Sequence, residues 1–489
     1  MFKMRTLEGL EPKSVFRFFE DISAIPRGSW NERQISDYMV GFAEQRGLNA
    51  YQDKALNVII YKPGTAGYEN SQPVIVQAHM DMVCEKNAGT EHDFEKDPLK
   101  LVVDGDYIRA SGTTLGADNG VGVAYALALL DSDDIAHPPL EVVMTVAEET
   151  GLEGAALVEA DKLSAKRMIN TDSGAEGVFT TSCAGGMRAS VCFAIERTDV
   201  SDGYSLCQLM LKGMAGGHSG GDIHHERANA NILLGRLLYE LNEKHDIYLA
   251  EIEGGAKDNA IPREARAVLA AHSDELAAIE SDATAFTAVL QKEFRNTDPD
   301  MHLEFKLAAE SSAPRKVLTK KLLDGITAAI LLTPNGVQAM DTNTEGMVET
   351  SNNLGAIKMT DDEVILTCAL RSSVASRKKL IETRIHALAE TLGASFSSGS
   401  DYPAWEYSAD SPIRKTCVET YKEMFGAEPV VTGIHAGLEC GVFGGKIPGL
   451  DIIAFGPNTP GIHTPDERMS ISSIAKVWGF LQEVMKRLK

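Results

Sequence analysis

The sequence has little positive charge and no long apolar run. Its 489 residues include 47 Lys and Arg against 70 Asp and Glu, which gives a formal net charge of −23. Nucleic acids and anionic membranes are bound through clustered Lys and Arg, so we expect neither as a partner. No apolar stretch approaches the about 20 residues that are needed to cross a bilayer.

Cysteine is also scarce. The seven cysteines are an odd number and contain no C-x-x-C pair, so a disulfide framework or a zinc ribbon is not expected. The first residues, MFKMRTLEGLEPKSVFRFFEDI, carry acids early and have no long apolar core, unlike a signal peptide. These features together predict a protein of the reducing cytoplasm.

The first third of the chain alternates between two kinds of pattern. Amphipathic stretches such as residues 12–25 and 31–46 predict helices, whereas short apolar runs such as residues 74–77 and 141–147 predict buried strands. This alternation predicts an α/β fold, with a mostly parallel sheet that has helices on both faces. The same alternation returns after Asp401.

The middle of the chain has a different pattern. Strands there are longer and alternate in polarity, and two come in succession before a helix, as at residues 188–197 and 204–213 before the helix 227–243. This pattern predicts an antiparallel sheet with helices on one face. We therefore expect a catalytic domain made of residues 1–186 and 401–489, interrupted by an inserted α+β domain at residues 187–400.

Five segments place acids or histidines where a strand should end. They are VIVQAHMDM with His79 and Asp81, TTLGADNGVG with Asp118, VVMTVAEETG with Glu148 and Glu149, MINTDSG with Asp172, and IAFGPNTPGIHTPDE with His463. Ligands of open α/β sheets bind beyond the carboxyl ends of the strands, so these side chains could converge on one point.

The residue types in these segments suit a pair of divalent metal ions. Two imidazoles and several carboxylates are good ligands for zinc, and one carboxylate can bridge two ions that activate a water. In the H-x-D segment the two side chains share a face, so Asp81 can hold the far ring nitrogen of His79. Of the adjacent pair Glu148 and Glu149, one would bind metal and the other would accept a proton from the water.

The five segments together resemble peptidase family M20, also called the carboxypeptidase G2/aminoacylase family. The order H-x-D, G-x-D-x-G, E-E, a strand-end Asp and a late His matches that family, as does the insertion before the late His. The segments AHMDMVCEKN, AEETGLEGA, AGGHSGGDIHHERANAN and GIHAGLECG are similar to those of the family's broad bacterial dipeptidases, which also cleave Xaa-His peptides such as carnosine.

The resemblance implies a role for each residue of the site. Asp118 would bridge the metals, His79 and Asp172 would complete one metal site, and Glu149 and His463 the other. Glu148 would be the general base, and Asp81 would support His79. The metals would be two divalent ions, with zinc the first choice and manganese or cobalt the alternatives.

The resemblance also implies that the inserted domain acts as a lid over the metal site. In that domain His218 would stabilise the oxyanion, Asn259 would hold the substrate backbone, and Arg371 would bind the substrate carboxylate. His435 and Glu439 would lie near the substrate, and Glu439 could meet a free amine, although a carboxylate at a helix start also has a purely structural use.

The expected substrate is therefore a small, unblocked dipeptide, and the expected assembly is a homodimer formed through the lid domain. Two alternatives remain. A deacylase of N-acyl amino acids would have the same metal site but no acid for a free amine. A binding protein that has lost catalysis would lack the general base or a ligand, and both are present in this sequence.

Overall fold

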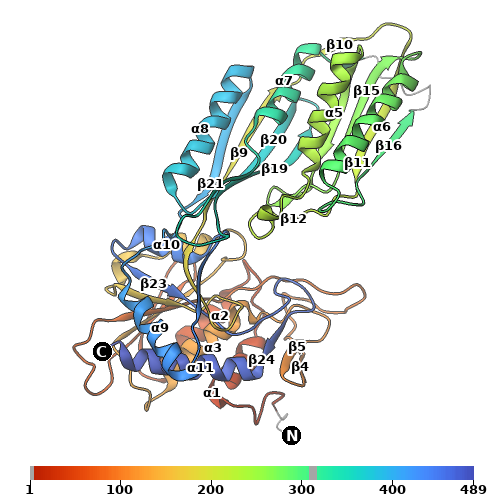
Figure 1. Cartoon of the computed structure of the whole chain (residues 1–489). Coiled ribbons are helices and arrows are strands. Elements are labelled where there is room, and N and C mark those ends of the chain that lie inside the picture. Colours follow the sequence, from red (N-terminus) through yellow and green to blue (C-terminus); the bar gives the residue numbers. More distant parts are fainter. Residues whose placement is uncertain (1–4, 308–315) are drawn as a thin grey trace. The chain divides into compact units, whose positions relative to one another are not determined.

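The structure is a computed structural model that describes residues 5–307 and 316–489. These residues form two compact units. Unit 1 comprises the described residues up to Cys183 together with Trp405–Gly433 and Leu438–Lys489, and unit 2 comprises Ala184–Ala404 and Ile434–Gly437. Figure 1 shows the elements of both units in sequence colours.

Unit 1 is built around an eight-stranded sheet with the order β1-β2-β6-β3-β7-β23-β8-β22. Its central strands β6, β3, β7 and β23 run parallel, whereas β1, β2 and β8 pair antiparallel with their neighbours. The strands are β1 (Asn49–Gln52), β2 (Val58–Lys62), β3 (Val74–His79), β6 (Leu140–Thr145), β7 (Arg167–Asn170), β8 (Val178–Cys183), β22 (Val430–Ile434) and β23 (Asp451–Ala454).

Helices cover both faces of this sheet. The main core contains side chains of β3 and β6 together with helices α1 (Lys13–Ser23), α2 (Arg33–Gln45), α3 (Ala117–Asp131), α9 (Pro412–Phe425) and α11 (Ile471–Arg487). On the other face lie α4 (Glu153–Leu157) and α10 (Glu439–Lys446). Gln77 of β3 shows this, because it points to the opposite face from its core neighbour Val76 and forms a hydrogen bond with Glu439, the first residue of α10. A small sheet joins β4 (Leu101–Asp104), β5 (Tyr107–Ala110) and β24 (Arg468–Ser470).

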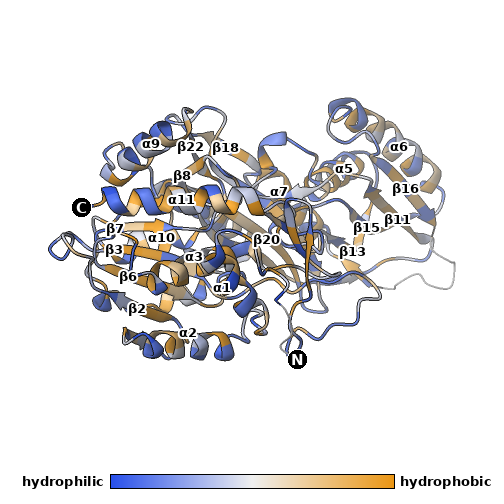
Figure 2. Cartoon of the chain, turned by 90° about the horizontal axis from the view of Figure 1, so that it is seen from below, coloured by the Kyte–Doolittle hydropathy of each residue, from blue (hydrophilic) through white to orange (hydrophobic). Residues whose placement is uncertain are grey.

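Burial explains why the central strands are so apolar. Every residue of β3 and of β6 is buried, because each strand has neighbours on both sides and helices above and below. Figure 2 shows β2, β3 and β6 mainly in the hydrophobic colour, whereas α2 and α11 carry both colours, as expected for helices with one solvated face.

Unit 2 contains an antiparallel sheet with the order β16-β11-β15-β13-β19-β20-β9-β21, and β18 pairs with β19. Figure 1 shows helices α5, α6, α7 and α8 side by side along one face of it. The strands are β9 (Gly185–Ala194), β11 (Tyr204–Lys212), β13 (Tyr248–Gly254), β15 (Ala265–His272), β16 (His302–Leu307), β18 (Gly336–Met340), β19 (Val348–Met359), β20 (Glu363–Ser372) and β21 (Ser395–Tyr402).

Four helices and four short strands complete the described part of unit 2. The helices are α5 (Ala230–Lys244), α6 (Leu276–Glu293), α7 (Lys320–Leu332) and α8 (Ala375–Leu392). The short strands form two pairs, β10 (Arg197–Asp199) with β17 (Lys316–Leu318) and β12 (Gly217–His218) with β14 (Ala260–Ile261). Helix α5 starts where Asn229 accepts hydrogen bonds from the backbone N–H groups of Asn231 and Ile232.

The expected α/β fold class with an α+β insert is confirmed, although the outer strands of the parallel sheet are antiparallel. The structure divides the chain after Cys183 and after Ala404, and it assigns Ile434–Gly437 to unit 2, whereas the sequence pattern placed these residues in the catalytic domain. Within the described residues, we find no helix with the length and apolar content of a membrane span.

Candidate metal centre

Three adjacent parallel strands bring most of the candidate residues to one edge of the sheet. His79 is the last residue of β3, and Asp172 follows the end of β7 by two residues. Glu148 and Glu149 follow the end of β6 in a turn where Ala147 adopts a positive φ of 49°. This conformation is uncommon for a residue with a side chain, and it reverses the strand so that both glutamates can face the same place.

Asp118 and His463 reach the same edge from other elements. Asp118 lies in the first turn of α3 with non-helical angles, after Gly116 with a φ of 66°. His463 lies in the segment between β23 and β24 and has a φ of 64°. The two residues are close, because the Nε2 atom of His463 lies 3.5 Å from Asp118 Oδ2.

Among the residues that the structure describes, three sets of side chains offer ligand atoms that lie within 4.8 Å of one another. They are His79 with Asp118 and Asp172, Asp118 with Glu149 and His463, and His79 with Glu148 and Glu149. The first two sets share Asp118, which directs Oδ1 to His79 Nε2 at 3.1 Å and Oδ2 to His463. A carboxylate with one oxygen toward each set has the arrangement that bridging two ions requires.

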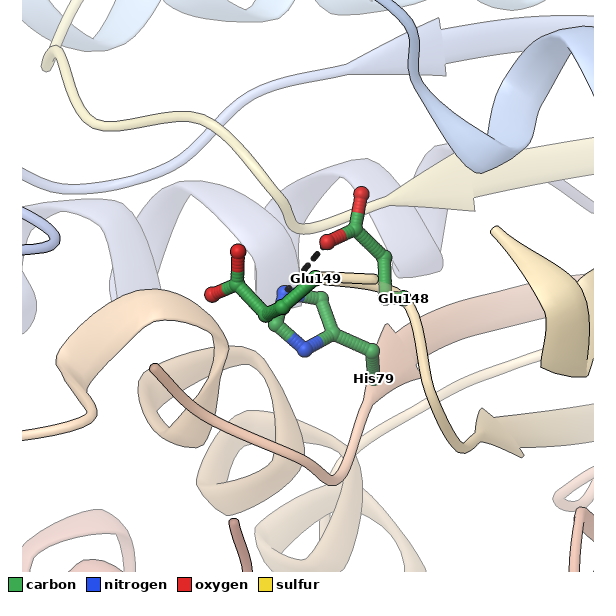
Figure 3. Close-up of side chains that lie close together, drawn as sticks. All are labelled: His79, Glu148 and Glu149. Carbon is green, nitrogen blue, oxygen red and sulfur yellow. Dashed lines mark ion pairs between the residues drawn. The ribbon is translucent and has the colours of Figure 1, made fainter. Parts of the chain in front are cut away.

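Figure 3 shows the third set, in which His79, Glu148 and Glu149 come from the ends of β3 and β6. The dashed line joins His79 Nε2 to Glu148 Oε2 at 4.0 Å. Glu149 Oε2 instead lies 2.9 Å from His463 Nε2, and Glu149 Oε1 is buried without a hydrogen-bond partner among the described residues. The two neighbouring glutamates therefore have different surroundings.

The pKa values show how strongly these groups interact. Burial raises the pKa of Glu148 well above its ordinary value, the His79 imidazole lowers it, and the charges of Asp172 and Glu149 raise it further. Burial together with the charge of Asp118 raises the pKa of Asp172 to about 7. Hydrogen bonds to Asp118 and Glu149 raise the pKa of His463 to about 11. Such a cluster of mutually perturbed acids and imidazoles is typical of a functional site.

Asp81 does more than the sequence predicts. Its Oδ1 lies 3.4 Å from His79 Nδ1, but this ring nitrogen has a shorter contact of 3.1 Å with the backbone oxygen of Asp81. The carboxylate mainly accepts from the backbone N–H groups of Glu148 at 3.1 Å and Glu149 at 3.3 Å, and from the Ser29 hydroxyl at 2.7 Å. Asp81 therefore fixes the turn that carries both glutamates as well as the imidazole.

Glu439 is fully buried beneath the site. Its Oε2 accepts hydrogen bonds from Gln77 and from Thr145, whose hydroxyl is 2.7 Å away. Burial raises the pKa of Glu439 to about 8. Gln77 in turn accepts from Asn170, which holds the backbone N–H of Asp172 at 3.0 Å. These contacts engage only Oε2, whereas Oε1 of Glu439 is buried without a hydrogen-bond partner among the described residues. That Glu439 meets a substrate amine stays a prediction.

The remaining candidates lie in unit 2, where they form two pairs. Asn259 is next to β14, and its backbone oxygen accepts from the N–H of Ser219, the residue after His218. Arg371 lies on β20 opposite Ser351, whose hydroxyl is 2.7 Å from His435 Nε2. Arg371 and His435 are both buried, and burial followed by the charge of Arg371 lowers the pKa of His435 to about 3.

The contacts of His218 fix its tautomer. Its Nδ1 accepts hydrogen bonds from the backbone N–H groups of Gly220 at 3.2 Å and Gly221 at 3.1 Å. A neutral imidazole that accepts at Nδ1 carries its proton on Nε2. His218 therefore presents Nε2–H as a donor.

The candidates of the metal centre were found by their position where strands end, and those of unit 2 by the family resemblance, but other residues near the site have neither signal. Glu467 and Arg27 are buried beside the site and touch the backbone around Asp118 and Asp81. Glu467 stands four residues after His463 in the same segment, and this proximity is the only hint that the sequence offers.

Comparison with known proteins identifies the family. The model of peptidase family M20/M25/M40 matches residues 75–487, so the chain belongs to this family. The chain is 39% identical to the cytosol non-specific dipeptidase of Escherichia coli (strain K12) over 485 residues, which is 99% of each chain. The resemblance to peptidase family M20 seen in the sequence is confirmed.

Solved structures agree with this assignment. The aminoacylhistidine dipeptidase from Vibrio alginolyticus matches with a TM-score of 0.89 and 37% identity, covering 99% of this chain and 98% of that one. The aminopeptidase PepT from Bacillus cereus matches with a TM-score of 0.57 and 14% identity, covering 98% of this chain and 99% of that one, which shows a common fold.

Proposed function

We propose that this chain is a cytoplasmic metallo-dipeptidase that hydrolyses unblocked dipeptides, including Xaa-His peptides such as carnosine. The observation that carries the proposal is the match to the cytosol non-specific dipeptidase over 99% of both chains. The solved aminoacylhistidine dipeptidase supports the Xaa-His part, since it covers nearly the whole chain at 37% identity.

The metals in this proposal are two divalent ions, with zinc the first choice and manganese or cobalt the alternatives. Their ligands would be His79, Asp118 and Asp172 for one ion and Asp118, Glu149 and His463 for the other. The support is the set of ligand atoms within 4.8 Å and the unpartnered, buried Oε1 of Glu149. Two imidazoles and carboxylates are borderline-hard donors that suit these ions. When bound, the ions would polarise the scissile carbonyl and lower the pKa of the attacking water.

Glu148 would be the general base. It would take the proton of the attacking water and deliver it to the leaving nitrogen, a transfer for which a raised pKa is favourable. Asp81 would hold the turn that carries Glu148 and Glu149 through the two backbone hydrogen bonds described above. Positioning of this kind keeps the base and the ligand in place before substrate binds.

Residues of unit 2 would bind and polarise the substrate. His218 would donate Nε2–H to the developing oxyanion, which fits its tautomer. Arg371 would bind the substrate carboxylate, for which a guanidinium is suited, and its Nη1 is oriented by the Tyr402 hydroxyl at 3.0 Å. Asn259 would hold the substrate backbone, and His435 would line the carboxylate subsite next to Arg371. In this proposal unit 2 is the family's lid and also forms a homodimer.

The test is activity measured together with metal content. We expect the purified chain to contain two divalent ions and to hydrolyse dipeptides, to lose both after exhaustive chelation, and to regain activity when zinc, manganese or cobalt is added. Full activity in demetallated protein would contradict the two-metal part. A metal-loaded chain that cleaves N-acetyl amino acids but not dipeptides would instead be the deacylase.

A further inference from the structure

Glu467 is a buried acid that binds the backbone rather than the proposed metals. It is only 2% exposed, and its two oxygens accept four consecutive backbone N–H groups. Oε2 accepts from Leu115 at 2.7 Å and Gly116 at 2.8 Å, and Oε1 accepts from Ala117 at 2.8 Å and Asp118 at 3.2 Å. One carboxylate therefore occupies all the donors of the turn that opens helix α3.

This contact connects two distant ligand segments. Asp118 is the last residue of the turn, and Glu467 follows His463 by four residues in a segment much later in the chain, since Glu467 and Asp118 are 349 residues apart. In the sets of ligand atoms described above, Asp118 and His463 belong to the same set. Any shift of Glu467 would move the turn of Asp118 relative to the segment of His463.

Arg27 connects a third segment to the same turn. Its Nη1 donates to the backbone oxygens of Met80 at 2.9 Å and Asp81 at 3.2 Å, and its Nη2 donates to the backbone oxygen of Gly116 at 2.5 Å. Arg27 is itself only 2% exposed. The guanidinium thus ties the end of β3, which carries His79, to the turn of Asp118.

The sequence makes room for this arrangement at Gly116. Its φ of 66° is a left-handed conformation that lets successive N–H groups point to one side. A Cβ at this position would collide with the Arg27 Nη2 atom and with the sulfur of Met82. Glycine at 116 therefore serves both the curvature of the turn and the close approach of the guanidinium.

We infer that Arg27 and Glu467 form a positioning pair that holds the segments of His79, Asp118 and His463 in register for metal binding. The inference deepens the proposed function and rests on its metal centre. Neither side chain is a member of the three ligand sets, and the charge of Glu467 favours the charged form of the buried Arg27.

An ordinary helix cap would also use an acid at this position, so the test needs a matched buried acid elsewhere. Glu141 supplies it. It is 6% exposed and accepts from the backbone N–H groups of Ser164 at 3.0 Å and Ala165 at 3.1 Å. It is the second residue of β6, four residues and roughly 13 Å of strand before the end of β6 at Thr145.

The experiment compares zinc affinity in Glu467→Gln and Glu141→Gln. A glutamine keeps the size of the side chain but turns one acceptor into a donor that opposes the backbone N–H groups. The full chain is demetallated, its folding is checked by circular dichroism, and zinc dissociation constants are measured by competition with a chromophoric chelator. We expect Glu467→Gln to bind zinc about 10- to 100-fold more weakly than wild type, and Glu141→Gln to stay within about 3-fold.

Zinc affinity separates this inference from the dipeptidase proposal. Equal zinc affinity in wild type and Glu467→Gln would overturn the positioning role, whatever the variant's stability. Equal losses of zinc affinity in Glu467→Gln and Glu141→Gln would overturn it as well. If Glu467→Gln does not fold, Arg27→Lys replaces it, since lysine keeps the charge but cannot bridge three carbonyls, and the same loss of affinity is expected. The dipeptidase proposal fails separately, if wild type with two zinc ions does not hydrolyse dipeptides.

Discussion

Exchanging Glu148 and Glu149 for glutamine, one at a time, should have two different effects. The residues are adjacent, have the same chemistry and are held by the same Asp81 carboxylate. Glu148 lies 4.0 Å from His79 Nε2, whereas Glu149 contacts His463 at 2.9 Å and shares a ligand set with Asp118. If Glu148 is the base and Glu149 a ligand, Glu148→Gln should remove proton transfer and Glu149→Gln should remove a metal.

The expected size of the first effect follows from the role of a general base. Such a group contributes about 10²- to 10⁴-fold to the rate, which is about 3–5 kcal/mol of transition-state stabilisation. The buried Glu148 carboxyl also lies among Asp172 and Glu149, so neutral glutamine removes like-charge repulsion there. We therefore expect Glu148→Gln to keep both ions and to fold at least as stably as wild type.

The assay is kcat on a dipeptide together with metal content after gel filtration. Glu148→Gln should retain two ions per chain with kcat lowered by about 10²- to 10⁴-fold, and Glu149→Gln should retain fewer than two. Loss of metal in Glu148→Gln would refute the assignment, because Glu148 would then be a ligand of the set with His79. Near-normal turnover in metal-loaded Glu148→Gln would refute its role as the base.

Two further predictions concern unit 2. His218→Ala should lower kcat by about 10²- to 10³-fold with little change in KM, since the donor acts on the transition state. The control, His224→Ala at an exposed neighbour, should keep wild-type kcat. Equal kcat in His218→Ala and wild type would contradict the proposal that His218 stabilises the oxyanion. Burial lowers the pKa of His435 to about 3 in the folded chain, whereas an unfolded histidine has a pKa of about 6.5. Between these pH values the unfolded chain binds a proton that the folded chain does not. The folded state therefore loses stability as the pH falls below about 6.5. The free energy of unfolding is measured with denaturant from pH 6.5 to 4.5. It should fall less steeply in His435→Gln than in wild type or in the exposed control His386→Gln. Identical slopes in the three proteins would contradict the buried neutral state of His435.

The sequence predicted the fold and the convergence of the candidate residues because both depend on simple patterns. Continuous apolar runs such as β3 and β6 indicate strands that are covered on both faces. Parallel neighbours have their carboxyl ends at one edge, so residues after the ends of β3, β6 and β7 had to lie close together. Asp118 and His463 were expected at the same point, and the structure brings their side chains to 3.5 Å.

Other features could not be predicted because they depend on local backbone and on distant partners. Helix α3 begins at Ala117 and includes a non-helical Asp118, and this turn is bound by Glu467 from a segment near the other end of the chain. The contacts of Asp81 with the turn after β6 depend on the positive φ of Ala147, which no residue type signals. Glu439 was expected near the substrate; the sequence could not show that its Oε2 accepts from Gln77 and Thr145, while its Oε1 has no hydrogen-bond partner among the described residues.

Substrate choice tests the central claim most directly. The metal-loaded chain should be compared on a dipeptide, its N-acetylated form and the tripeptide that is one residue longer, with carnosine as the Xaa-His substrate. We expect kcat/KM for the dipeptide to exceed both analogues by at least about 10²-fold. A displaced carboxylate would leave the buried Arg371 without its charged partner, and a blocked amine would leave the buried Glu439, its predicted contact, without one. Comparable kcat/KM for the dipeptide and either analogue would contradict the dipeptidase function.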